Sequence, residues 1–199
     1  LRANNSKAWF DANRADYLAG YVEPAKRFVE ACGDVLASIA PGVSAEPRVL
    51  GSIFRINRDT RFSQDKTPYK DHLDLWFWEG ERKGAVSGFF VRITPYVVVV
   101  GAGCHGFDAA RLGVFRQAVA DADTGTSLAT IVDTLHRDGY EVGGAGHKRQ
   151  PAGYAALPAA APLLLQKALF VHRDEPADDR LGDGRIVDVC VGHWRTMAP

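Results

Sequence analysis

The chain opens with two stretches in which apolar residues recur every three or four positions. Residues 4–17 form the first stretch, which begins with Asn4 and Asn5 as candidate caps, and residues 22–39 form the second. Such spacing places apolar side chains on one face of an α-helix. Pro41 and Gly42 end the second stretch, because neither residue continues a helix well. We therefore predict a hairpin of two helices at the start of the chain.

From residue 49 onward the apolar residues alternate with polar ones, which is typical of β-strands. Predicted strands cover residues 49–56, 72–78, 86–94 and 96–101, the last of which is an unbroken apolar run. A parallel crossover between two strands needs about a dozen or more residues, and the connections within residues 72–101 are shorter than that. The pattern therefore predicts an antiparallel meander in the middle of the chain.

The second half of the chain predicts further helices and two short strands. The helices cover residues 108–120, 126–136 and 158–167, a last helix begins at Asp183, and the strands cover residues 140–142 and 168–172. No linker or internal repeat separates these elements. We predict an α+β fold, an antiparallel β-sheet meander with helices packed mainly on one face, in one domain that covers residues 1–199.

Composition narrows the class of protein. The chain has 24 Lys and Arg against 24 Asp and Glu, which argues against general nucleic-acid binding, because duplex binders usually carry a surplus of positive charge. The longest apolar runs, such as residues 96–100, are too short to cross a bilayer, and no signal segment opens the chain. We expect a cytoplasmic protein that does not bind a membrane.

The cysteines point to the same compartment. Cys32, Cys104 and Cys190 are odd in number, far apart in the sequence and surrounded by apolar residues. This pattern is typical of buried, reduced thiols rather than of a disulfide framework. Neither Cys104 with His105 nor Cys190 with His193 has a matching second pair, so we predict no metal site.

The densest chemistry lies in residues 55–70, which we call the basic segment. Five basic side chains stand there against two acidic ones, Asp59 and Asp65, so the segment carries a surplus of three positive charges. The bases are Arg55, Arg58, Arg61, Lys66 and Lys70. Guanidinium groups bind carboxylates and phosphates through two parallel hydrogen bonds. The segment therefore predicts an anion site.

We predict that this site binds a small phosphorylated or carboxylated ligand. Asp59 and Asp65 support the bases, and a second basic cluster closes the site. The predicted ligand-binding residues are Arg55, Arg58, Arg61, Lys66, Tyr69, Lys70, Lys148, Arg149 and Lys167. No cofactor is predicted. The residues leave open whether the protein is an enzyme and which oligomer it forms.

Two alternatives remain open for the basic segment. In the first, the Arg and Asp residues form a structural ion-pair network within a non-catalytic structural or interaction domain. In the second and weaker one, Trp76 and Trp78 stack on the bases of a single-stranded nucleic acid beside the basic side chains.

Two other patterns were weighed as functional sites. Residues 101–106 fit G-x-G-x-x-G, but the preceding strand belongs to a meander, and this context does not suit a dinucleotide-binding fold. His72 and Asp74 share one face of a predicted strand. They suit a cation site, a base with its orienting carboxylate, or a surface pair.

The basic segment also carries a resemblance to a known family. Residues 53–70 read IFRINRDTRFSQDKTPYK, and this run resembles the signature of the DUF2461 family, a family of unknown function. Shorter matches occur in NNSKAWF (residues 4–10), GAG (residues 101–103) and KRQPAGY (residues 148–154). The resemblance implies one domain and brings no activity, cofactor or catalytic residue with it.

Overall fold

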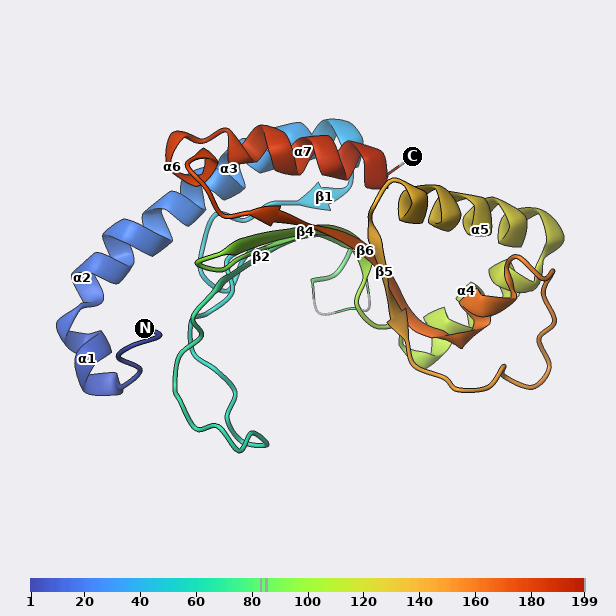
Figure 1. The fold of residues 1–199 in the computed structure, drawn as a ribbon, viewed down its shortest axis with the longest axis horizontal. Helices are drawn as coiled ribbons and strands as arrows, with labels where there is room; N and C mark the ends of the chain where they lie inside the picture. Colours follow the sequence, from blue (N-terminus) through green and yellow to red (C-terminus); the bar gives the residue numbers. More distant parts are fainter. Residues whose placement is uncertain (83, 85, 199) are drawn as a thin grey trace. The chain divides into compact units, whose positions relative to one another are not determined.

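A six-stranded antiparallel sheet forms the centre of the fold (Figure 1). The structure is a computed structural model that describes residues 1–82, 84 and 86–198. The strand order is β1-β2-β3-β4-β6-β5. The strands are β1 (Val43–Ser44), β2 (Leu73–Glu79), β3 (Gly88–Ile93), β4 (Val97–Cys104), β5 (Glu141–Ala145) and β6 (Gln166–Pro176).

Strands β2, β3 and β4 are neighbours in chain order, as the alternating pattern predicts. Leu75 and Phe77 of β2 lie two positions apart and are both buried, as are Val98 and Val100 of β4. One face of each strand therefore lies in the core, and this burial stabilises the sheet. The α+β class and the antiparallel meander are confirmed.

The predicted strand at residues 49–56 is wrong. Leu50 adopts a left-handed φ of 68°, so the backbone turns at this point instead of extending. A single antiparallel bridge joins Ile53 to Leu75 of β2, and the Phe54 amide donates to the Asp74 carbonyl at 3.0 Å. The alternating sequence thus borders the sheet without becoming a strand of it.

The predicted helical hairpin is also wrong. Helices α1 (Lys7–Ala12), α2 (Arg14–Tyr17), the π-helix η1 (Leu18–Val22) and α3 (Glu23–Ile39) follow one another closely as a curved helical run (Figure 1). Ser6, rather than Asn4 or Asn5, caps α1. Asn13 interrupts the run, because its side-chain amide donates to the Trp9 carbonyl at 2.8 Å and competes with the helical backbone.

The later helices follow the predicted pattern with shifted ends. Asp108 caps α4 (Ala109–Ala120), as predicted, and α5 (Ala122–Arg137) begins earlier than predicted, with Asp121 as its cap. A short 3-10 helix, η2 (Ala161–Leu165), stands where a longer helix was predicted. Gly184 ends α6 (Arg180–Asp183) in a left-handed conformation, so α7 (Ile186–Met197) starts later than Asp183.

The described chain divides into two compact units. The first comprises Leu1–Phe77, Phe90–Val100 and Asp174–Gly192, and the second Trp78–Phe89, Gly101–Arg173 and His193–Pro199. In the first unit, α3 buries Val29, Cys32 and Leu36. In the second, Val119 and Leu164 belong to a buried apolar cluster formed by α4, α5 and η2. The single domain expected from the sequence stays a prediction.

The G-x-G-x-x-G run has a structural role in the second unit. Gly103 lies in β4 with a φ of 130°, and a Cβ atom there would be 2.4 Å from the Leu169 carbonyl oxygen of β6. Only glycine fits this approach of two strands without strain. This glycine therefore meets a packing requirement of an antiparallel sheet.

A pair of glycine substitutions tests this role. We expect Gly103→Ala to lower the free energy of unfolding by about 2–4 kcal/mol, because the new methyl group meets backbone atoms at a strained φ. Gly106→Ala is the matched control, since nothing lies within 4 Å of its would-be Cβ atom. Urea denaturation of both variants measures the difference. Equal stability of the two variants would contradict the assignment.

Candidate functional site

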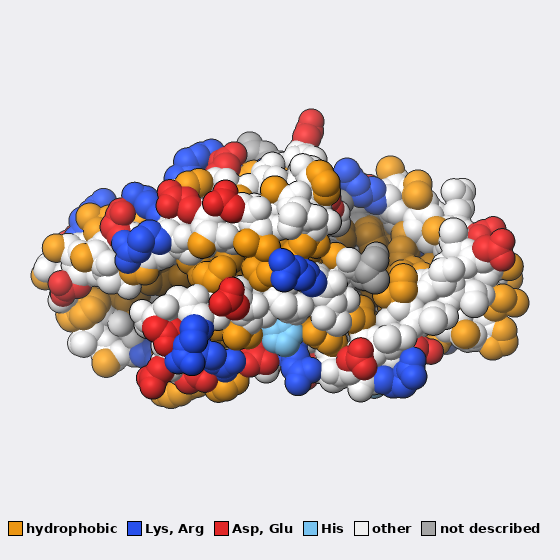
Figure 2. Space-filling view, turned by 90° about the horizontal axis from the view of Figure 1, so that it is seen from above, with side chains coloured by type: hydrophobic (Ala, Val, Ile, Leu, Met, Phe, Trp, Pro, Cys, Tyr) orange, Lys and Arg blue, Asp and Glu red, His pale blue; other side chains and the backbone are white. Residues whose placement is uncertain are grey.

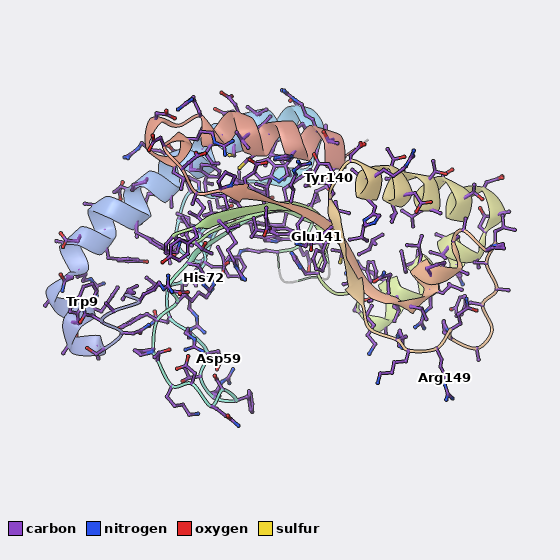
Figure 3. All side chains as sticks on the ribbon, viewed as in Figure 1. Trp9, Asp59, His72, Tyr140, Glu141 and Arg149 are labelled. Atoms are coloured by element: carbon purple, nitrogen blue, oxygen red, sulfur yellow. The ribbon has the colours of Figure 1, made fainter. Side chains whose placement is uncertain are left out.

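The basic segment belongs to the first unit and projects from the sheet as two extended stretches of chain that run side by side (Figure 1). The two sides are joined near the sheet by backbone hydrogen bonds. The Arg58 amide donates to the Pro68 carbonyl at 2.9 Å, and the Lys70 amide donates to the Ile56 carbonyl at 2.8 Å. Figure 3 shows His72 near the sheet and Asp59 farther out along the segment. We call the end of the segment that adjoins the sheet its base, and the opposite end its tip.

The base is held by an apolar contact and an amide clamp. The Tyr69 ring stacks on Phe10 of α1, with 4.4 Å between the ring centroids, and only 6% of Tyr69 is exposed. The Asn5 side chain donates to the Tyr69 carbonyl at 2.9 Å and accepts from the Tyr69 amide at 3.0 Å. Tyr69, a predicted ligand-binding residue, therefore lies with its ring in the core.

Asp74 of β2 neutralises the bases near the sheet. Its carboxylate lies 2.7 Å from the Lys70 ammonium, 2.6 Å from Arg92 Nε and 3.3 Å from His72 Nε2. Burial would raise the pKa of Asp74, but hydrogen bonds from Arg92 and Lys70 outweigh it and hold this pKa below its ordinary value. The structural ion-pair interpretation thus applies to Lys70.

His72 lies between two carboxylates at the edge of a cleft. Its Nδ1 atom is 3.1 Å from Asp71, its Nε2 atom faces Asp74, and its carbonyl accepts a hydrogen bond from the Tyr21 hydroxyl. The cleft has a volume of about 320 Å³ and mostly apolar walls, which include Phe28 and Ile93. Both ring nitrogens of His72 face carboxylate oxygens, so neither points to a ligand as a free base.

Two exposed ion pairs occupy the tip. Arg61 binds Asp59 through two parallel contacts, from Nε at 2.9 Å and from Nη2 at 2.6 Å. Arg58 Nη1 contacts Asp65 at 2.5 Å. Hydrogen bonds from the Arg61 side chain and backbone lower the pKa of Asp59 to about 2. Both carboxylates of the segment are therefore used by Arg58 and Arg61.

Two other basic side chains of the segment, Arg55 and Lys66, lack acidic partners among the described residues. The Lys66 ammonium donates to the Thr60 carbonyl at 2.9 Å, and Arg55 extends into solvent. Within the described part of the chain, no carboxylate lies within ion-pair distance of either. The charge of Arg55 nevertheless contributes to the lowered pKa of Asp59, so the Arg55 side chain lies within electrostatic range of that carboxylate. The positive surplus of the segment thus comes from Arg55, whose backbone lies near the sheet between Phe54 and Ile56, and from Lys66 at the tip.

The second basic cluster belongs to the other compact unit. Lys148 and Arg149 lie in the exposed loop after β5, where Figure 3 labels Arg149, and Lys167 is exposed near the start of β6. Their role in closing the site of the basic segment stays a prediction. Trp78 is only 3% exposed, so its ring is not available to stack on a nucleic acid base.

Charge is mixed over the surface. Figure 2 shows Lys and Arg side chains interspersed with Asp and Glu, and no broad area of one sign covers the face in view. This mixture agrees with the equal numbers of acidic and basic residues. The surplus of positive charge in the basic segment therefore comes from individual residues and not from an overall positive charge of the protein.

The cysteines are buried, as predicted. Cys32, Cys104 and Cys190 are free thiols, and burial raises the pKa of Cys190 to about 12. Among the described residues, no group of three His, Cys, Asp or Glu side chains is arranged to hold a metal ion. In the same part of the chain, no helix has the length and apolarity needed to cross a bilayer.

The comparisons with known proteins concern the whole chain. The sequence profile of the family described as "Conserved hypothetical protein (DUF2461)" matches residues 1–199. No curated protein and no solved structure shows a significant match.

Removal of Asp74 tests the structural role of the base. We expect Asp74→Ala to lower the free energy of unfolding by about 2–4 kcal/mol, because it leaves the half-buried Lys70 ammonium without a counter-charge and removes the contact with Arg92. Asp59→Ala is the matched control, and we expect a much smaller loss of stability, because that pair is exposed. Thermal and urea denaturation measure both. Equal losses of stability in the two variants would contradict the conclusion that the ion pairs at the base of the segment are structural and those at the tip are not.

The pKa of Asp59 gives a test at low pH. The folded-state pKa, about 2, lies below the ordinary value of 3.8. The pair with Arg61 therefore contributes stability above the unfolded pKa, and this contribution is lost as the pH falls toward 2. We expect Arg61→Gln to return the pKa of Asp59 toward 3.8 in a carboxyl-carbon NMR titration. Arg27→Gln, on the exposed side of α3, is expected to leave it unchanged; an unchanged pKa in Arg61→Gln would refute the pairing.

Proposed function

Because the chain belongs to the DUF2461 family, whose description assigns no activity, we propose a function from the basic segment: its tip binds a small phosphorylated or carboxylated ligand. The observation that carries the proposal is the pair of unneutralised bases, Arg55 and Lys66. A cation without a partner is satisfied by water or by an anionic ligand, and several such groups together favour the ligand.

The ion pairs of the tip support this proposal by orienting the neighbouring guanidinium groups. Asp59 binds the edge of Arg61 that carries Nε and Nη2, and Asp65 contacts only Nη1 of Arg58. The remaining N–H groups of both side chains are directed by these contacts and stay free to donate. Side chains held in place in this way lose less conformational entropy when they bind.

The weakness of the pairs also suits ligand binding. Arg61 is 76% exposed in its side chain, and exposed ion pairs contribute at most about 1 kcal/mol. An incoming anion therefore displaces or joins a carboxylate at small cost. The half-buried contact of Lys70 with Asp74 does not offer this freedom, so we place the ligand at the tip and not at the base.

The proposal is for binding rather than for a reaction. A catalytic base must reach a ligand, and both ring nitrogens of His72 face Asp71 and Asp74 instead. The Tyr69 ring lies in the core beside Phe10. No cofactor is part of the proposal.

One observation favours a second candidate function, an interaction segment for a partner protein. Phe62 at the tip is 95% exposed, and the Arg61 guanidinium lies 5.8 Å from its ring centroid. Aromatic and arginine side chains are the commonest anchors of protein interfaces. This candidate predicts that Phe62 contributes to binding, whereas the anion site depends on Arg55 and Lys66.

Titration with inorganic phosphate and with citrate tests the anion site. We expect the double substitution Arg55→Ala and Lys66→Ala to weaken binding by about 1.5–3 kcal/mol for each lost charged hydrogen bond. Because both side chains lack a carboxylate partner, we expect little change in stability. Isothermal titration calorimetry measures the affinity, and thermal denaturation measures the stability.

Two controls separate the candidate functions. Arg27→Ala removes an exposed cation from α3, so its affinity for either anion is expected to equal that of the parent. Phe62→Ala leaves every base of the tip in place, and an anion site is expected to survive it. Unchanged anion affinity in the double variant would refute the proposal. Loss of affinity in Arg27→Ala to the same extent would show that only general charge attraction is measured.

A further inference from the structure

The second unit brings together three basic side chains that are far apart in the sequence. Arg116 comes from α4, His147 from the loop after β5 and Lys167 from the start of β6. Arg116 Nη2 lies 2.9 Å from His147 Nε2. An arginine only donates, so this imidazole nitrogen is the acceptor. The sequence pattern did not reveal this cluster, because Arg116 and His147 are 31 positions apart.

Backbone hydrogen bonds fix the loop that carries His147. The amides of Gly146 and His147 both donate to the Leu165 carbonyl, at 3.1 Å and 2.9 Å. Gly146 has no side chain, and the aliphatic stem of Lys167 lies where one would be. The Arg116 guanidinium lies 5.8 Å from the centroid of the Tyr154 ring. The three bases are therefore brought together by regular contacts of the fold.

No acidic group balances these bases. In the described part of the chain, no carboxylate lies within ion-pair distance of Arg116, Lys167, Lys148 or Arg149. Burial, and then the charges of Lys167 and Arg116, lower the pKa of His147. Arg116 and Lys167 are therefore two positive charges beside a neutral imidazole, and an anion between them would relieve their repulsion.

Arg116 also has an unused hydrogen-bond donor. Its Nε atom is buried and has no acceptor among the described residues. A buried donor without an acceptor destabilises the fold, and the destabilisation is larger for a charged group. Buried polar groups of this kind usually bind an ordered water or an ion. This observation is independent of the charge count and also indicates a missing acceptor.

We propose that Arg116, His147 and Lys167 form a second binding site, which takes the phosphate group of a small molecule. A tetrahedral phosphate presents several acceptor oxygens and thus matches donors that approach from three elements. Arg116 supplies a guanidinium edge, Lys167 a mobile ammonium, and His147 the N–H of its Nδ1 atom, because its Nε2 atom accepts from Arg116. Lys148 and Arg149 lie in the adjoining loop and add positive charge.

This site shares no residue with Arg55 and Lys66, which carry the first proposal. All of its residues belong to the second compact unit, whereas residues 55–70 belong to the first. Either site can therefore be removed without changing the residues of the other, and failure of one proposal leaves the other standing.

The test is an NMR titration of the full chain with inorganic phosphate, against sodium chloride at equal ionic strength. We expect phosphate to shift the Nε–H resonance of Arg116, because this donor gains an acceptor. We also expect phosphate to raise the pKa of His147, since a bound dianion favours the imidazolium beside Arg116 and Lys167. Chloride is expected to produce neither change. An unmoved Arg116 resonance in phosphate, or an equal shift in chloride, would overturn the proposal.

Two substitutions test whether the phosphate-dependent shift of Arg116 arises from the proposed site. Lys167→Ala changes an exposed side chain. We expect it to lower the affinity for phosphate, measured from the phosphate-dependent shift, by about tenfold. Arg116→Lys keeps the charge but removes the guanidinium edge, and a similar loss is expected. Arg137→Lys on α5 is the matched control and should bind phosphate as the parent does. Retention of full affinity by Lys167→Ala and Arg116→Lys would refute the site.

Discussion

The contact of Asp74 with Lys70 and Arg92 is the interaction on which the basic segment depends. It joins the last residue of the segment to β2 and β3, and it does so where the side chains are half-buried. A carboxylate in such a place needs its cations, and the cations need it. The stacking of Tyr69 on Phe10 and the amide clamp of Asn5 hold the same base from the side of α1. The segment is thus firmly attached at one end.

This attachment explains why the charges of one short segment behave differently along its length. Near the sheet, Lys70 is neutralised and its ammonium lies 5.1 Å from the Phe54 ring centroid, so it belongs to the structure of the base. Farther out, Asp59 and Asp65 each hold one arginine, and two other basic side chains of the segment, Arg55 and Lys66, remain without a carboxylate in the described residues. The sequence left two interpretations of the basic segment, an ion-pair network and an anion site, and they therefore apply to different parts of the segment. The structural one describes the base, and the anion site is our proposal for the tip.

The sequence predicted the elements whose causes are local. Alternating residues such as Leu75 and Phe77 predicted strand β2, and Asp108 predicted the start of α4. The strand predicted at residues 49–56 failed because Leu50 turns the chain, and no propensity of leucine indicates a left-handed conformation. Periodicity carries no information about such a turn.

Features that depend on distant residues were not predictable in this way. Asn5 read as a helix cap, yet it binds the backbone of Tyr69, 64 positions away. Tyr69 read as a possible ligand group beside two lysines, yet its ring packs on Phe10. The contact of Arg116 with His147 likewise has no local signal. In each case the three-dimensional fold, and not the spacing along the chain, decides which side chains meet.

The central claim is that the segment is structural at its base and binds an anion at its tip. A crystal structure of the chain with tungstate, a tetrahedral anion whose strong scattering marks its position, tests this claim most directly. The account predicts tungstate within hydrogen-bond distance of Arg55 and Lys66, with Lys70 and Arg92 still bound to Asp74. Tungstate bound at Lys70 in place of Asp74, or bound elsewhere while the tip stays empty, would contradict it.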